Sequence, residues 1–112
     1  MNVYKVFHDA LAATSFPVTQ QPVVGDGAIY LTFFEVIGHP TGFASNQARR
    51  IEHIMQVDIF ARKQPGPELV TVLLSLKHEG IQAVSWGPMD YEPDTKWHHL
   101  PITCKYTEIS IE

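Results

Sequence analysis

The sequence predicts an α+β domain of two layers, in which two helices cover one face of a mostly antiparallel sheet, in the order α-β-β-α-β-β. Three observations indicate this fold class. Two segments carry apolar residues at helical spacing. Several others are rich in β-branched and aromatic residues, as strands are. Clusters of proline and glycine separate these segments. Amphipathic helices and half-apolar strands bury their apolar sides by packing on one another, which gives the two layers.

The first half of the chain predicts one helix and two strands. A helix is expected from about Val3 to Ala13, because apolar residues recur at i, i+3, i+4, i+7 and i+8. Prolines and glycines predict a loop over Ser15–Gly27. Ala28–Val36 is β-branched and aromatic on both faces, so we expect a central strand there. Gly38–Gln47 is polar and predicts a second, flexible loop.

Ala48–Arg62 has the alternation of a strand with one well-buried face and one partly covered face. The buried set is Ile51, Met55, Val57 and Ile59, with His53 among them. The opposite set is Glu52, Gln56, Asp58 and Arg62, interrupted by Ile54 and Phe60. Phe34, Phe60, Ile54 and Ile109 are expected near the second face of the sheet. Exposed apolar residues of this kind would form an apolar surface patch of the type that marks interaction sites, which points to self-assembly.

The second half predicts a helix and two more strands. The helix begins at Pro67 and Glu68, where proline and a carboxylate suit the first turn. Its core stripe is Leu69, Val72, Leu73 and Leu76, widened by Val70 and Leu74. Gly80 supplies a left-handed C-terminal cap. Strands are expected over Ile81–Trp86 and Pro101–Ile111, and in the latter Ile102, Cys104 and Tyr106 share one face.

Composition limits the classes of function. The 112 residues suffice for a single domain with its own core, spanning residues 1–112. A net charge of −4 argues against a protein that binds nucleic acid by neutralising phosphates. No apolar run approaches the ~20 residues of a membrane helix, and Asp9 interrupts any apolar export signal. The single cysteine, Cys104, cannot form an internal disulfide, which favours a reducing, cytoplasmic setting.

The chemistry-bearing residues predict no catalytic, cofactor-binding or metal site. Six histidines suggest a metal, but His98 and His99 are adjacent and would point to opposite faces of a strand. No zinc-binding spacing is present. We expect His53 to be a hydrogen-bonded core residue and Cys104 to be a small buried residue rather than a nucleophile. The carboxylates near Pro93 are expected to be solvated turn residues.

The segment Trp86–Tyr106 is rich in aromatic and charged residues, and its start has the prolines and glycine of a surface connection. It suits a contact surface better than a catalytic one. Tyr91 and Trp97 flank its acidic turn and are of the types enriched at interfaces. Packing of both rings on the edge of their own sheet is the alternative. The candidate interface residues are Phe43, Arg49, Arg50, Asp90, Tyr91, Glu92, Asp94 and Trp97.

Four segments together resemble a known family. They are MNVYKVFHDAL, RRIEHIMQVDIFAR, PELVTVLLSLKHEGI and GPMDYEPDTKWHHLPITCKYTEI. Their order, the chain length and the character of the last two segments are similar to those of the small tail-completion proteins of long-tailed phages and prophages. These proteins are also called tail terminators or head-tail joining proteins. The resemblance covers nearly the whole chain and includes no diagnostic motif residue.

The resemblance implies a structural role without catalysis. Proteins of this family form a ring, commonly a hexamer, at the head-proximal end of the tail tube in the virion, after assembly in the bacterial cytoplasm. The ring stops growth of the tube and contacts the head connector, and DNA passes through it without specific binding. The expected partners are therefore further copies of the chain, the major tail tube protein and the connector, with no membrane involved. A closed ring needs two different complementary patches on each subunit.

Two alternatives stay open at this stage. One is a neighbouring virion part, such as a head-closure protein or a minor tail component, which the same composition permits. The other is a small α+β enzyme or ligand-binding domain unrelated to phages, suggested by the histidines and aromatic residues. The latter would have a concave pocket with convergent polar groups.

Overall fold

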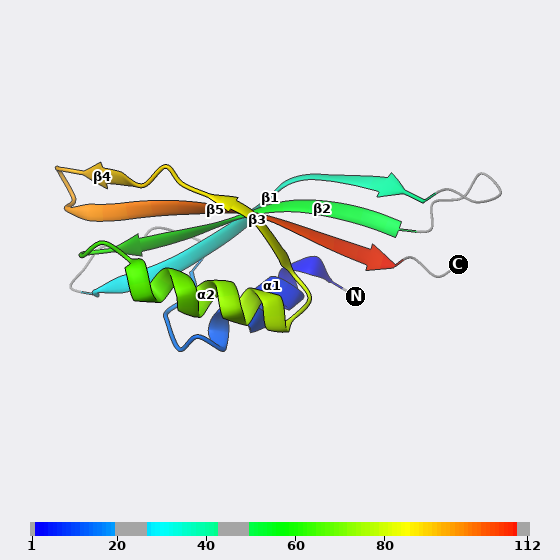
Figure 1. The fold of residues 1–112 in the computed structure, drawn as a ribbon, viewed down its shortest axis with the longest axis horizontal. Helices are drawn as coiled ribbons and strands as arrows, with labels where there is room; N and C mark the ends of the chain where they lie inside the picture. The colour runs from blue at the N-terminus through cyan, green and yellow to red at the C-terminus, as the bar shows by residue number, and fades with distance from the viewer. Residues whose placement is uncertain (1, 20–26, 43–49, 110–112) are drawn as a thin grey trace.

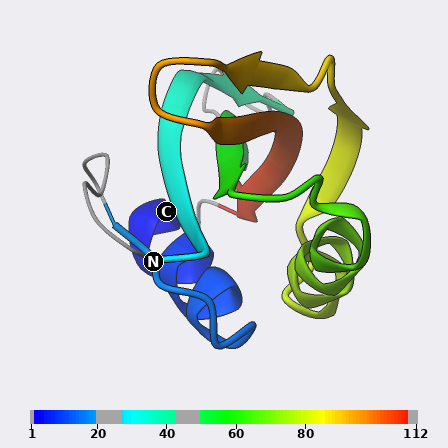
Figure 2. The same cartoon turned by 90° about the vertical axis from the view of Figure 1, so that its left-hand side faces the viewer.

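The computed structural model describes residues 2–19, 27–42 and 50–109 (Figure 1). Its elements are α1 (Val3–Ala12), β1 (Ile29–Thr41), β2 (Arg50–Ala61), α2 (Gly66–His78), β3 (Gln82–Trp86), β4 (Asp90–Glu92) and β5 (Trp97–Ile109). Both helices lie on the same side of an antiparallel sheet (Figure 2). The predicted α+β class is confirmed, and the predicted order holds apart from one additional short strand, β4.

The strand order is β1-β2-β5-β3, and β4 pairs with the beginning of β5. β1 is therefore an edge strand, and the prediction of a central strand over Ala28–Val36 is wrong. The two faces of β1 are apolar for different reasons. Leu31 faces the helices and belongs to the core, whereas Tyr30 stacks on Phe60 on the opposite face of the sheet. Part of its edge is also covered, because Leu31 exchanges backbone hydrogen bonds of 2.8 and 2.9 Å with Pro17 and Thr19.

The core lies between the helices and the sheet. Its fully buried large side chains come from α1, β1, β2, α2 and β5, and include Phe7, Leu11, Leu31, Met55, Ile59, Leu76 and Ile102. The predicted buried face of β2 is thus confirmed for His53, Met55, Val57 and Ile59, whereas Ile51 is half-buried. On α2 the stripe is narrower than predicted, because Val70 and Leu74 are 54% and 62% exposed. Gly80 ends α2 with a φ of +77°, as predicted for a left-handed cap.

Three strands continue beyond the helices (Figure 1). We call this part the strand extension and define it as Ile37–Thr41, Arg50–Ile54 and Lys105–Ile109. It makes the molecule elongated, at 53 × 23 × 22 Å. The loop predicted over Gly38–Gln47 is wrong as far as Thr41, because these residues pair with β2, and residues 43–47 lie outside the described part of the chain.

The second face of the sheet carries an aromatic stack at the end opposite the strand extension. Tyr30, Phe60 and His99 occupy one row of the register and stack with ring centroids 4.7 and 4.5 Å apart. Trp97 meets Tyr30 edge-on at 5.0 Å. Because this stack and β4 extend the pairing, β5 begins at Trp97, four positions before the predicted start at Pro101.

Candidate functional site

The sequence-predicted interface residues are spread over two ends of the molecule. Phe43 and Arg49 lie outside the described residues. Arg50 is exposed at the start of β2, where it pairs with Thr41 and Ile109 in the strand extension. The remaining candidates lie on β4, in the turn after it, and at the start of β5, at the far end of the sheet.

The two aromatic candidates, Tyr91 and Trp97, differ in their exposure to solvent. Tyr91, on β4, is 47% exposed and its ring lies 4.8 Å from that of His98. Trp97 is only 6% exposed, beneath the guanidinium of Arg62 at 3.8 Å. The expectation that Trp97 belongs to a contact surface is therefore corrected, because its edge-on contact with Tyr30 and the guanidinium of Arg62 over its face bury the ring. Asp90 and Asp94 are exposed, whereas Glu92 is half-buried and accepts a hydrogen bond from Thr95.

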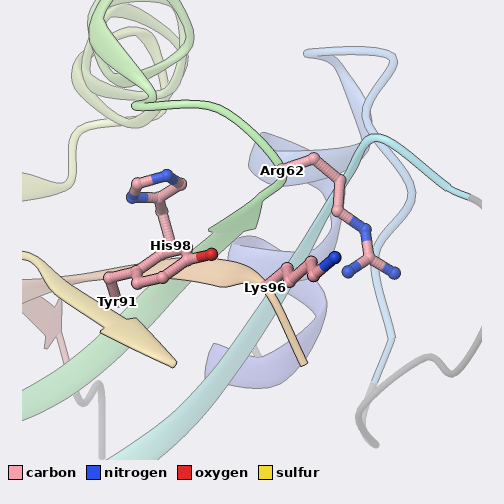
Figure 3. A pocket seen from close by; sticks show the side chains of 4 residues that line it. All are labelled: Arg62, Tyr91, Lys96 and His98. Atoms are coloured by element: carbon pink, nitrogen blue, oxygen red, sulfur yellow. The ribbon is translucent and has the colours of Figure 1, made fainter. Parts of the chain in front are cut away.

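Tyr91 lines an open cleft of about 640 Å³ at this end of the sheet, together with Arg62, Lys96 and His98 (Figure 3). Lys96 has a φ of +61°, a conformation that lysine rarely adopts. Arg62 is anchored by a hydrogen bond to the carbonyl oxygen of Thr95 and by the ring of Trp97. The four lining side chains are basic or aromatic and include no carboxylate or thiol nucleophile. Such a lining suits an anionic group or a planar ring rather than covalent catalysis.

A second, more apolar surface lies between α2 and β3. Val70, Leu73, Leu74 and Lys77 follow one another at helical spacing on α2. Leu73 and Lys77 also line a cleft of about 490 Å³, whose other wall includes Ala83 and Trp86 of β3. Trp86 is 50% exposed. We call these six residues the α2–β3 patch.

A third surface lies on the edge strand β1. Phe34, Val36 and Ile37 are 46%, 55% and 56% exposed within four consecutive positions, and we call them the β1 patch. The sequence predicted Phe34 near the second face. Val36 falls in a register shift between Glu35 and Ile37, where β1 carries an extra residue. Because β1 and β3 are at opposite edges of the sheet, the two apolar patches lie on different sides of the molecule.

A polar cluster centred on the buried His53 links the three strands of the strand extension, and the sequence did not predict the two partners of this histidine. His53 on β2 is 8% exposed, and its two ring nitrogens contact the carboxylates of Glu35 on β1 and Glu108 on β5. His53 was expected to be hydrogen-bonded in the core, and this is confirmed. The signal for its partners was the strand alternation, which puts Glu35 after Leu31 and Phe33, and Glu108 after Cys104 and Tyr106, on the face toward the helices.

Other titratable groups are engaged in structure. His98 and His99 do lie on opposite faces of β5, and Nε2 of His99 is 2.7 Å from Oδ1 of the buried Asp58. Cys104 is fully buried, and this burial raises the pKa of its thiol to about 12. A thiol that stays protonated at neutral pH is a poor nucleophile. Among the described residues, no three histidine, cysteine, aspartate or glutamate side chains are arranged to hold a metal ion.

Comparisons with known proteins leave the chain without a family assignment, since no family model and no curated protein matches it. Over residues 2–19, 27–42 and 50–109, neither helix has the length and apolar character needed to cross a membrane.

Proposed function

We propose that the chain is a structural subunit that assembles head to tail into a closed ring of identical copies. The ring would be of the kind that caps the tail tube of a long-tailed phage and joins it to the head connector. The observation that carries the ring is the pair of dissimilar apolar patches, the β1 patch and the α2–β3 patch, at opposite sheet edges. The phage setting rests on the resemblance in element order and length, and the partners there would be tube protein and connector.

Two patches on opposite edges favour a head-to-tail contact over a two-fold one. In a two-fold dimer the same surface meets itself, so one patch suffices and the other stays in water. In a ring the β1 patch of one copy covers the α2–β3 patch of the next, and both are removed from water at every contact. Trp86 is the expected centre of this contact, because half-exposed tryptophans beside a cleft are typical anchors of interfaces.

Native mass spectrometry of two variants, each of which damages one patch, tests the oligomeric state and the head-to-tail arrangement of the subunits. Ile37→Lys damages the β1 patch and Trp86→Ser damages the α2–β3 patch, and each alone should reduce the ring to monomers. An equimolar mixture of the two variants retains one intact contact. It should therefore give a heterodimer that cannot grow, with no ring. Thr71→Ala, on the exposed side of α2, is the matched control and should leave the ring intact.

Other outcomes of that experiment decide against the proposal. If Ile37→Lys disrupts the oligomer and Trp86→Ser does not, the contact is two-fold through the β1 patch. A wild-type chain that remains monomeric both alone and with purified tail tubes would exclude the ring itself. Negative-stain images of mixtures with tubes would distinguish a terminal cap from a head-closure protein or a minor tail component, because only the cap binds the tube end.

The ligand-binding alternative is favoured by one observation, the basic and aromatic cleft at Arg62, Tyr91, Lys96 and His98. Arg62, Tyr91 and Lys96 direct their polar groups to one side of it, whereas the imidazole of His98 points away from them (Figure 3). Calorimetric titration with inorganic phosphate and with a nucleoside monophosphate would test it. Saturable binding that Lys96→Ala abolishes, in a chain that stays monomeric, would favour this function over the ring.

A further inference from the structure

His53 joins three strands through its two ring nitrogens. On β1, Nδ1 hydrogen-bonds to Oε2 of Glu35, and on β5, Nε2 lies 3.0 Å from Oε1 of Glu108. Both contacts run diagonally across the register, because His53 itself is opposite Gly38 and Tyr106. One side chain that is 8% exposed thus connects β1, β2 and β5 where the apolar core ends.

The backbone of β1 is adapted to this cluster. Regular alternation would place Glu35 and Gly38 on opposite faces, but the extra residue at Val36 brings both to the face of His53. A Cβ atom at position 38 would lie 2.8 Å from Oε2 of Glu35 and 3.6 Å from Nδ1 of His53. Any side chain larger than that of glycine would therefore displace the carboxylate from the imidazole.

The charge state of His53 is set by these neighbours. Burial lowers the pKa of the imidazole, but the hydrogen bonds to Glu35 and then to Glu108 outweigh burial, so the pKa is raised above its ordinary 6.5. Other titratable groups are packed nearby. The ring centroid of Tyr106 on β5 is 6.3 Å from that of the imidazole, Lys5 and Asp9 on α1 pair with each other, and Glu52 pairs with His39 and Lys105 on the opposite face.

We propose that His53 is a protonation-controlled clamp, which holds β1 and β5 to β2 when charged and releases one of them when neutral. The charged imidazole donates from both nitrogens and serves both carboxylates at once. The neutral imidazole has only one N–H, so a lone pair faces the second carboxylate, and that half-buried charge loses its donor. The strand extension beyond the helices is then joined at this point by one side-chain hydrogen bond instead of two.

The consequence concerns the flexibility of the strand extension and does not depend on ring formation. The helix-covered strands have apolar packing that is unaffected by the proton on His53. The strand extension has less of it, because His53 is the only one of its described residues that is buried. Loss of the clamp should therefore open Ile37–Thr41 and Lys105–Ile109 locally, while Val57 and Ile59 stay protected.

Two measurements on the whole chain test the clamp between pH 6 and pH 9. Nuclear magnetic resonance of the imidazole nitrogens follows the proton on His53. Amide hydrogen exchange, divided by the intrinsic rate at each pH, follows local opening. We expect opening of the strand extension to rise about tenfold with a midpoint that coincides with the titration of His53, since one hydrogen bond to a charged group is lost. Opening that is independent of pH, or that has another midpoint, would overturn the clamp.

Variants separate the clamp from a merely structural histidine. His53→Gln should remove the pH-dependent step and leave the strand extension open at every pH. Glu108→Gln keeps a hydrogen-bond acceptor but removes the charge, so His53 should titrate at lower pH and opening should shift with it. This variant is informative even if His53→Gln does not fold. His99→Gln, which removes the histidine–aspartate pair on the opposite face, should leave the step unchanged. An equal loss of the step in His99→Gln would contradict the assignment.

Discussion

Ile59 and Ile37 are the same residue type on neighbouring strands, yet the first is fully buried and the second is 56% exposed. Ile59 lies in the part of the sheet that α1 and α2 cover, where both sequence alternation and helix packing exclude water. Ile37 lies in the strand extension opposite Ile54, so its side chain is on the second face of the sheet, away from the helices (Figure 2). The two regions share continuous strands but differ in what holds them.

The difference assigns a different role to each region. Around Ile59, burial of apolar side chains provides the stability, which does not depend on the protonation state of those side chains. In the strand extension, backbone pairing is supplemented by polar links, namely His53 between Glu35 and Glu108 on one face and Glu52 with Lys105 on the other. A region held by polar links opens more readily and can also adapt to a partner.

The largest expected effect concerns Cys104, because its thiol becomes accessible only when the helix-covered part of the sheet unfolds completely. The thiol is fully buried, and burial raises its pKa to about 12. Modification by a thiol reagent at pH 8 should be at least about 10³-fold slower than in the denatured chain, since it requires global unfolding. Stopped reactions analysed by mass spectrometry would measure it. Rapid modification of the native chain would mean that β5 opens without unfolding.

The next effect compares the two isoleucines directly. Ile59→Ala should lower the free energy of unfolding by about 2–5 kcal/mol, because it leaves a cavity in the core. Ile37→Ala should change it by less than about 0.5 kcal/mol, as is usual for exposed positions. Urea denaturation of both variants is the measurement. Equal losses would show that the strand extension is packed as tightly as the core.

Much of the covered region was predictable because its determinants are local. The alternation of β2 assigned Met55, Val57 and Ile59 to the buried face, and Gly80 marked the end of α2. The place of β1 at an edge was not predictable, because apolar residues on both faces are also what a central strand has. The aromatic stack that buries its second face involves residues far apart in the sequence, such as Tyr30 and Trp97.

The polar cluster of the strand extension could not be predicted from the sequence, for a related reason. Its contacts span 18 residues between Glu35 and His53 and 55 residues between His53 and Glu108. They also depend on the register shift at Val36, which no residue pattern marks. A strand slipped by one residue would turn each of these side chains to the other face. Sequence alternation could identify a polar residue facing inward, but only the register identifies its partner.

A smaller effect is expected from two glycine substitutions. Gly38→Ala should lower the free energy of unfolding by about 1–3 kcal/mol, because the new methyl group meets the carboxylate of Glu35 at 2.8 Å. Gly66→Ala is the matched control in the first turn of α2, where a Cβ atom has no neighbour within 4 Å. It should raise stability by about 0.4–1 kcal/mol. Thermal and urea denaturation would measure both, and a neutral Gly38→Ala would mean that Glu35 can move away without loss.

The smallest effect is the dependence of stability on pH in the strand extension. Because the pKa of His53 is raised in the folded chain, its contribution is fully present below pH 6.5 and is lost as the pH rises through the raised value. The free energy of unfolding should therefore fall by about 1 kcal/mol on the alkaline side, the value of one hydrogen bond. Urea denaturation from pH 6 to pH 9 would measure it, with His53→Gln as the reference.

The reference variant decides which region the proton stabilises. Other histidines contribute to the pH dependence of both chains alike, so the difference between wild type and His53→Gln isolates the cluster. If opening is confined to the strand extension, the stability difference should disappear at alkaline pH while Cys104 remains protected from modification. If Cys104 of the wild-type chain instead becomes reactive as His53 loses its proton, the two regions unfold together as one cooperative unit. The helix-covered core and the strand extension would then not differ in local stability.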